Sequence, residues 1–194
     1  MELSSLGELR TGYQLRGAVR PQEDGSHTII QLGDVGDDGV RGERLIRMTL
    51  DRVRARDLIA HGDLLLRSRG ASYRAALVVD CPSPTVATTP LYVFRLTDNR
   101  VSPEYLVWFI NREVTQGALA GAAHGTVIPT VGIEAFATLK IIIPPLEKQH
   151  EIVQIDALLR TERTLSLQVL EKRERLARTY MERIIEFYQE EGQA

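Results

Sequence analysis

The last quarter of the chain, from Leu146 to Glu191, contains no proline and no glycine. Its residues are mainly Leu, Glu, Arg, Gln and Ala, which favour the α-helix. One continuous helix of this length would measure roughly 68 Å at about 1.5 Å per residue, which is longer than the rest of the chain can cover. Pro144 and Pro145 follow the apolar run 141–143, and proline ends a strand because it supplies no ladder N–H group. We therefore predict a globular domain over residues 1–143 and a long helix within residues 144–194.

The predicted helix carries an apolar stripe whose members mostly follow one another at three- and four-residue steps. The stripe thins at Glu162 and over residues 171–175, so the heptad pattern is imperfect. An exposed stripe of this length favours a second helix as its partner, and we predict that the chain dimerises through it. The residues expected at the dimer contact are Ile155, Leu158, Leu159, Leu165, Val169, Leu176, Tyr180 and Ile184.

Short apolar runs separated by turn residues fill the first hundred residues, which predicts a β-rich region. Strands are expected within 27–39, 63–70, 75–80 and 91–96, and another over 138–143. Together with the helices, these strands predict an α+β fold.

One further helix is expected to begin near Ser102, which is a suitable N-cap, with Pro103 in the first turn. Helical spacing of the apolar residues that follow predicts one face packed on the sheet. This face would consist of Leu106, Phe109, Ile110 and Val114.

The composition is that of an ordinary protein with one globular core, and the formal charge of −2 gives no global preference for polyanions. A single cysteine, Cys81, excludes an internal disulfide framework and a multi-cysteine zinc cluster. No signal-peptide pattern and no apolar run of about 18 residues is present, which predicts a cytoplasmic protein without a membrane partner.

Motifs of the common catalytic sites do not occur in the sequence. The residues two positions before the three lysines are Thr138, Leu146 and Leu170, so the acid that a common nuclease motif places there is missing. The "IPPL" sequence lacks the polar and aromatic residues that flank the prolines of adenine methyltransferases. No phosphate-binding Gly-rich loop is present, and the four histidines lack metal-ligand spacing.

Positive charge is concentrated locally. Between Arg41 and Arg74, nine arginines (41, 44, 47, 52, 54, 56, 67, 69 and 74) outnumber four acids (43, 51, 57 and 63). Arginine neutralises phosphates and donates two hydrogen bonds to guanine, although a solvated surface explains such a charge run equally well. The segment "RSRGASYR" places basic and aromatic residues on one glycine-containing turn, and we predict DNA contacts from Arg67, Ser68, Arg69, Tyr73 and Arg74.

A second candidate loop, "AAHGTVIPT", spans residues 122–130. His124, Thr126 and the backbone amides near Gly125 suit contacts to bases or phosphates, so His124 and Thr126 join the predicted DNA-binding residues. The alternative is that Gly125 simply ends the preceding helix.

Several motifs occur in a familiar order. The segments are "GDLLLRSRG" (62–70), "TPLYVFRL" (89–96), "SPEYLVWFI" (102–110) and "AHGTVIPTVGIEAFATLKIIIPPLEKQHEIV" (123–153), followed by the long helix. Over nearly the whole chain, this set resembles a target-recognition module of the specificity subunit of type I DNA restriction-modification enzymes. Each motif alone is weak, whereas the ordered set is specific.

The resemblance implies a function and a set of partners. In that family the globular module recognises one half of a bipartite DNA sequence, and the long helix pairs antiparallel with its counterpart and docks adenine methyltransferase subunits. The specificity subunit has no catalytic activity and binds no cofactor, while S-adenosylmethionine, ATP and Mg²⁺ serve the methyltransferase and restriction/translocase subunits. The partners expected are double-stranded DNA, both kinds of subunit and a second copy forming an antiparallel coiled coil.

The sequence departs from the family pattern because it carries one recognition module and one long helix, whereas family members generally carry two of each. It is therefore either a half-length subunit that dimerises, a fragment or a degenerate copy. Two other functions remain open: an assembly protein that acts through the helix without binding DNA, and an enzyme whose site would be a deep pocket with perturbed acids or histidines.

Overall fold

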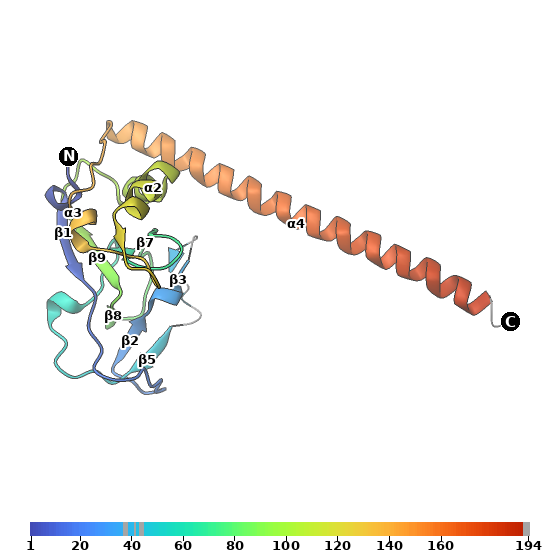
Figure 1. Cartoon of the computed structure of the whole chain (residues 1–194), viewed down its shortest axis with the longest axis horizontal. Coiled ribbons are helices and arrows are strands. Elements are labelled where there is room, and N and C mark those ends of the chain that lie inside the picture. The colour runs from blue at the N-terminus through green and yellow to red at the C-terminus, as the bar shows by residue number, and fades with distance from the viewer. Residues whose placement is uncertain (37–38, 41, 43–44, 192–194) are drawn as a thin grey trace. The chain divides into compact units, whose positions relative to one another are not determined.

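The computed structural model describes residues 1–36, 39–40, 42 and 45–191, with side chains described as far as Phe187. The chain forms two compact units, Met1–His150 and Glu151–Ala194. The first, called the globular unit below, holds the sheets and the short helices, and the second consists mainly of helix α4 (Leu146–Glu191) (Figure 1). The predicted α+β class and the long C-terminal helix are confirmed. The helix begins at Leu146, and the units divide four residues later, after His150.

The main sheet of the globular unit is antiparallel and has the strand order β1-β9-β6-β7. The expected strands at 63–70, 75–80 and 91–96 are found as three of its members. Leu64, Leu65 and Leu66 are fully buried, which explains the continuous apolar run of the central strand β6. The four strands are β1 (Gly7–Thr11), β6 (Leu64–Arg67), β7 (Ala75–Leu77) and β9 (Leu91–Leu96).

A second, smaller sheet has the order β5-β2-β8, in which β2 runs antiparallel to β5 and parallel to β8. Its strands are β2 (His27–Ile30), β5 (Ile46–Met48) and β8 (Thr85–Ala87), and a short hairpin of β3 (Val35–Gly36) and β4 (Gly39–Val40) follows β2. One apolar cluster takes residues from both sheets, so the core of the globular unit connects them. It contains Ile30, Val35, Ile59, Leu65, Ala76, Val78, Ala87, Leu91 and Val93.

The expected helix after Ser102 is two helices, α1 (Pro103–Asn111) and α2 (Glu113–Gly121). Its start is confirmed, because the Ser102 hydroxyl accepts the Tyr105 N–H at 3.1 Å. Between the helices, Arg112 has extended backbone angles, φ −60° and ψ 142°. The break turns α2 away from the predicted face, and Val114 is 76% exposed, so its predicted burial is wrong.

Side chains replace the hydrogen bonds that the break removes. Two carbonyl groups near the end of α1 lose their normal partners four residues later. The Thr115 hydroxyl donates to the Phe109 carbonyl at 2.8 Å, and the Gln116 amide donates to the Ile110 carbonyl at 2.9 Å. The residues that compensate for the break thus lie in the first turn of α2.

The strand expected over residues 138–143 is also wrong. This segment makes a single β-bridge, between Glu2 and Lys140, and Ile141 exchanges two backbone bonds with Met1. The pairing cannot lengthen into a ladder because the N-terminal segment turns at once into the 3-10 helix η1 (Leu3–Ser5). Ile141 is buried, whereas Ile142 is 69% exposed.

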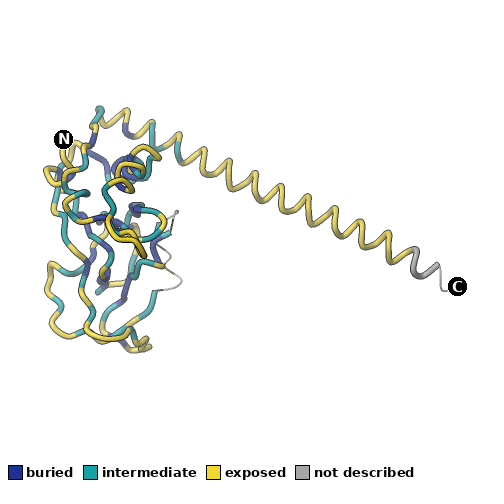
Figure 2. Tube along the Cα trace, in the orientation of Figure 1, coloured by how far each residue is buried: buried dark blue, intermediate teal, exposed yellow. Residues whose placement is uncertain are grey.

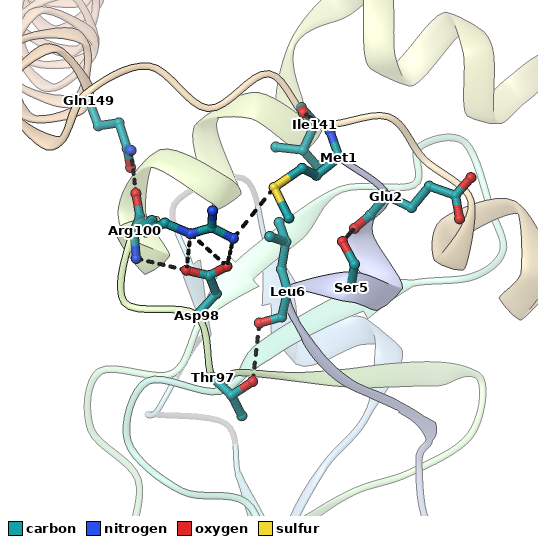
Figure 3. A network of polar contacts seen from close by, with 9 residues as sticks. All are labelled: Met1, Glu2, Ser5, Leu6, Thr97, Asp98, Arg100, Ile141 and Gln149. Atoms are coloured by element: carbon teal, nitrogen blue, oxygen red, sulfur yellow. Dashed lines mark hydrogen bonds and ion pairs between the residues drawn. The ribbon is translucent and has the colours of Figure 1, made fainter.

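The first turn of α4 is fastened to the globular unit by Gln149, whose side chain is fully buried. Its Oε1 accepts the Ser102 N–H at 2.8 Å, and its Nε2 donates to the carbonyls of Arg100 and Pro144, both at 2.8 Å. Figure 3 shows the Gln149–Arg100 contact beside the ion pair of Arg100 and Asp98, whose closest N–O distance is 2.6 Å. The hydrogen bonds from Arg100 lower the pKa of Asp98 to about 2. One amide thus joins the start of α1, the loop before it and the start of α4.

Most of α4 beyond that turn is exposed to solvent. Every residue from Ala157 to Phe187 is exposed (Figure 2). The eight predicted dimer-contact residues are between 40% and 72% exposed, and Leu167, Leu170, Met181, Ile185 and Phe187 add further exposed apolar surface. Across the described residues, no helix combines the length and apolarity that a membrane crossing requires.

Candidate nucleic-acid interface

The segment Arg67–Arg74, called the arginine turn below, connects β6 to β7. Gly70 has a φ of +110°, a left-handed conformation that glycine adopts without strain. The Arg67 N–H donates to the Arg74 carbonyl at 3.0 Å, so the two ends of the turn lie side by side. The turn therefore presents the intervening residues at the end of a buried strand.

Two side-chain amides from the helices hold the returning arm of the arginine turn. Asn111 exchanges two hydrogen bonds with the backbone of Ala75, at 2.8 and 2.9 Å. Gln116 does the same with Tyr73, at 2.9 and 3.1 Å. These amides act as a neighbouring strand would, and they fix the backbone of the turn at the edge of the sheet.

The second candidate loop is a β-hairpin. Its strands are β10 (Ala123–His124) and β11 (Thr130–Val131), and its five connecting residues, Gly125–Pro129, are called the hairpin loop below. The hydroxyl of Tyr92 donates to the Val131 carbonyl at 3.0 Å, and its ring contacts Phe136 edge-on at 5.7 Å between centroids. Burial raises the pKa of Tyr92, so this hydroxyl keeps the proton that it donates to β11.

Backbone contacts join the arginine turn to the hairpin, although the two are far apart in sequence. The Val131 N–H donates to the Ser68 carbonyl at 2.7 Å, and the Gly70 N–H donates to the Pro129 carbonyl at 3.4 Å. Arg69 and Thr130 form an antiparallel β-bridge between these two bonds. The arginine turn and the hairpin loop are therefore one surface, called the paired-loop surface below.

The structure separates the seven predicted DNA-binding residues by exposure. Arg69, His124 and Thr126 are exposed, and Arg67 and Arg74 are half-buried. Ser68 and Tyr73, at 2% and 5% exposed, lie inside the globular unit. The Ser68 hydroxyl donates to the Pro90 carbonyl. Because alternate residues of an extended segment point to opposite sides, the residues next to outward-facing Arg69 and half-buried Arg74 are turned inward.

Arg67 is the least satisfied of the predicted residues. One terminal nitrogen of its guanidinium is 3.4 Å from the Val35 carbonyl, which is a weak hydrogen bond. Its Nε is buried and has no hydrogen-bond partner among the residues that the structure describes. A buried guanidinium nitrogen normally has an acceptor, so this position offers an unused donor beside the paired-loop surface.

Two acidic residues near the arginine-rich segment are paired with arginines. Asp63 accepts two hydrogen bonds from Arg95, both at 2.7 Å, and Asp57 accepts from Arg54 at 3.2 Å. Arg41, Glu43 and Arg44 lie outside the described residues. The arginine turn and the hairpin loop contain no acidic residue at all, so the local balance of the paired-loop surface is positive.

The structure gives little support to the alternative that the chain is an enzyme. A large open hollow of about 1040 Å³ is lined by residues 11–16, by Asp51 and Asp57, and by Arg52 and Arg54. Burial of Asp57 raises its pKa, but the hydrogen bonds from Arg54 outweigh this effect, so the pKa is lowered overall. A general acid needs the opposite shift. No group of metal-ligating side chains occurs among the described residues.

Sequence reasoning missed one feature of this surface. Val127 and Ile128, at the tip of the hairpin loop, are 90% and 53% exposed. The "VIP" triplet was visible in the sequence, but an apolar triplet predicts burial unless the loop around it is known to project.

A family model described as the type I restriction modification DNA specificity domain matches residues 3–171 of this chain. No curated protein matches it.

Among solved structures, the HsdS subunit from Thermoanaerobacter tengcongensis is similar at 18% identity, with a TM-score of 0.61 over 85% of this chain and 43% of that one. The S subunit of the M. genitalium type I restriction-modification system gives 13% identity and a TM-score of 0.55, over 83% and 38%. A chain from a structure concerned with assembly and conformational transition of the type I system gives 16% and 0.54, over 83% and 37%. At these identities the likeness shows the fold, and this chain spans less than half the length of each relative.

Proposed function

The chain belongs to the family of type I restriction modification DNA specificity domains, and from this membership we propose that it recognises a specific DNA sequence for a type I restriction-modification complex. The observation that carries the proposal is the paired-loop surface. It brings two loops of matching chemistry together on a rigid sheet edge, which is where recognition residues gain precise positions.

Arg69, His124 and Thr126 are the direct contacts of the proposal, since their side chains are exposed. Arg67 and Arg74 are half-buried at the two ends of the same turn and contribute positive charge to it. Ser68 and Tyr73 support the backbone of the surface instead of touching DNA, because their side chains are buried.

The test measures DNA affinity of the reconstituted complex at fixed salt. Arg69→Ala should weaken binding by about 1–3 kcal/mol if the guanidinium contacts a base, with relaxed specificity at one position. A phosphate contact would instead lower affinity for all sequences and reduce the salt dependence by about one counterion. Arg178→Ala, the same change on α4, is the matched control. Unchanged affinity for both variants would remove the paired-loop surface from the interface.

Dimerisation is the second part of the proposal. The exposed apolar stripe of α4 pairs antiparallel with that of a second copy, which buries surface that one chain leaves in water. Each copy then reads one half of a bipartite target. Because two identical readers related by a two-fold axis meet the same bases on opposite strands, the target is an inverted repeat with an unread spacer.

Catalysis belongs to other subunits in this proposal. The chain docks DNA adenine methyltransferase subunits that use S-adenosylmethionine and, in a complete system, a restriction/translocase subunit that uses ATP and Mg²⁺. All of them work in the cytoplasm.

Mapping of methylated adenines tests the two-fold arrangement. Deletion of about one helical turn within α4 shortens it by roughly 5 Å, which equals between one and two base pairs of DNA. The same half-sites should then appear at closer spacing, or methylation should be lost if the altered rotation prevents assembly. An asymmetric target would contradict the two-fold arrangement.

The exposed helix also favours a second candidate function, an assembly protein that does not bind DNA. It predicts that complexes form normally while DNA affinity is independent of Arg69.

A further inference from the structure

Three adjacent apolar residues at the tip of the hairpin loop leave their side chains exposed to solvent. Val127 is 90% exposed, Ile128 is 53% exposed, and Pro129 is exposed as well. Single exposed apolar side chains are common, but a consecutive run is avoided on protein surfaces unless it serves a function.

The hairpin keeps its shape without these side chains. Gly125, with a φ of +104°, makes the turn into the loop, and the Thr130 hydroxyl donates to the Ile128 carbonyl at 3.2 Å. The base is fixed by the Tyr92 hydroxyl and by the backbone bonds to the arginine turn. The tip is thus an apolar projection on a fixed support, so contact with a partner would order few additional bonds.

The residues around the tip indicate the chemistry of its partner. Arg69, His124 and Thr126 are exposed in the same surface, and neither loop contains a carboxylate. A matching partner presents negative charge together with a few apolar groups at fixed positions. Duplex DNA offers this combination in its major groove, where the 5-methyl group of thymine is the apolar feature among phosphates and polar base edges.

We propose that Val127 and Ile128 contact thymine methyl groups, and that these residues help determine which sequence the chain selects. The inference rests on the proposed function and adds two specificity-determining residues to it. The arginines supply charge and hydrogen bonds, and the tip distinguishes thymine from cytosine by its methyl group.

The experiment combines a change in the protein with a change in the DNA. Methylation mapping first gives the target, and duplexes are then made in which each thymine of the half-site is replaced singly by deoxyuridine, which lacks only the methyl group. Affinity is measured for the reconstituted complex with wild-type chain, Val127→Ser and Ile128→Ser. Both residues are exposed, so folding is checked by thermal unfolding only as a precaution.

With wild-type protein, one or two of these replacements should weaken binding about fourfold, the value expected for one buried methyl group. Val127→Ser or Ile128→Ser should weaken binding to the thymine duplex and show no further loss on the deoxyuridine duplex at that position. Val114→Ser, the same change at an exposed position on α2, should leave both affinities unchanged.

Three results would overturn the inference while the proposed function stands. They are a wild-type affinity unchanged by every deoxyuridine replacement, equal losses for the variants on every duplex, or unchanged DNA affinity with weaker binding of the methyltransferase subunits. Absence of any sequence-dependent binding by the wild-type complex would instead remove the proposed function, and the inference with it.

Discussion

The globular unit and helix α4 satisfy their apolar residues in opposite ways. In the globular unit the apolar side chains of two sheets and α1 are buried against one another, and Leu64 to Leu66 are fully inaccessible. In α4 every residue from Ala157 to Phe187 is exposed. Leucine therefore stabilises the fold where it is buried in the globular unit, whereas in α4 it leaves apolar surface exposed to solvent.

This difference in burial predicts that the stability of the globular unit is independent of protein concentration, whereas that of α4 depends on it. Contacts within the globular unit form in every molecule, whereas the proposed contacts of the α4 stripe would form only when two helices meet. Isolated helices gain little from propensity alone, so the proposed association is expected to supply most of the stability of α4.

The largest effect is expected from charges placed in the stripe. Leu158→Glu together with Val169→Glu should abolish the proposed dimer, because two charges per helix would be buried in an apolar seam. Light scattering should then give the mass of one chain, while thermal unfolding of the globular unit stays unchanged. Gln154→Glu with Gln168→Glu adds the same charges off the stripe and should leave the dimer intact. Persistence of the dimer in the first variant would place the contact elsewhere.

A matched pair of leucines measures the contrast directly. Leu65→Ala should lower the free energy of unfolding by about 2–5 kcal/mol at any protein concentration, since it leaves a cavity in the core. Leu165 is 55% exposed, so Leu165→Ala leaves no cavity in the core of a single chain. This variant should lower the free energy of unfolding only by weakening the proposed dimer, and the loss should therefore vary with protein concentration. Urea unfolding at several concentrations separates the two. A concentration-independent loss from Leu165→Ala would show that the helix packs within its own chain.

Gln149 lies in the first turn of α4, and its buried side chain bonds to the backbone of the globular unit. Gln149→Met keeps the length of the side chain but leaves the Ser102 N–H and two carbonyls without their partner, which should cost about 1–3 kcal/mol. His150→Ala, at the exposed neighbouring position, should change stability little. Urea unfolding compares them, and equal stability of the two variants would mean that water replaces the amide at no cost.

The smallest effect concerns pH. Hydrogen bonds from Arg100 hold the pKa of Asp98 at about 2, below the usual value of an aspartate, so the ionised carboxylate favours the folded state. This contribution is present above about pH 4 and is lost as the pH falls towards 2. Asp98→Asn should therefore show a slightly smaller loss of melting temperature between about pH 5 and pH 2 than wild type. Identical acid dependence of Asp98→Asn and wild type would deny Asp98 this role.

Sequence patterns predicted the elements that depend on local chemistry. The absence of proline and glycine gave the extent of α4, Ser102 with Pro103 gave the start of α1, and the "LLL" run gave β6. The break at Arg112 was not predictable in this way, because it depends on Thr115 and Gln116 finding carbonyl groups in the preceding turn.

For the candidate site, too, local features could be predicted from the sequence and long-range contacts could not. The sequence indicated both loops, but their union depends on two long-range backbone bonds that no side-chain pattern encodes. The inward direction of Ser68 and Tyr73, and the outward direction of Val127 and Ile128, follow from how the sheet and the hairpin are oriented. Residue type alone assigned Ser68 and Tyr73 in the opposite sense and gave no direction for Val127 and Ile128.

The two backbone bonds between Ser68 and Val131 and between Gly70 and Pro129 also bear on how such a protein changes its target during evolution. Gene segments that encode the arginine turn and the hairpin are far apart, so a crossover between them inherits one loop from each parent. Because each loop supplies the other's hydrogen-bond partner, a mismatched inheritance alters the backbone of both. New specificities should therefore arise by exchange of the entire stretch from before Arg67 to beyond Val131. A designer who transplants one of the two loops should transplant the other with it.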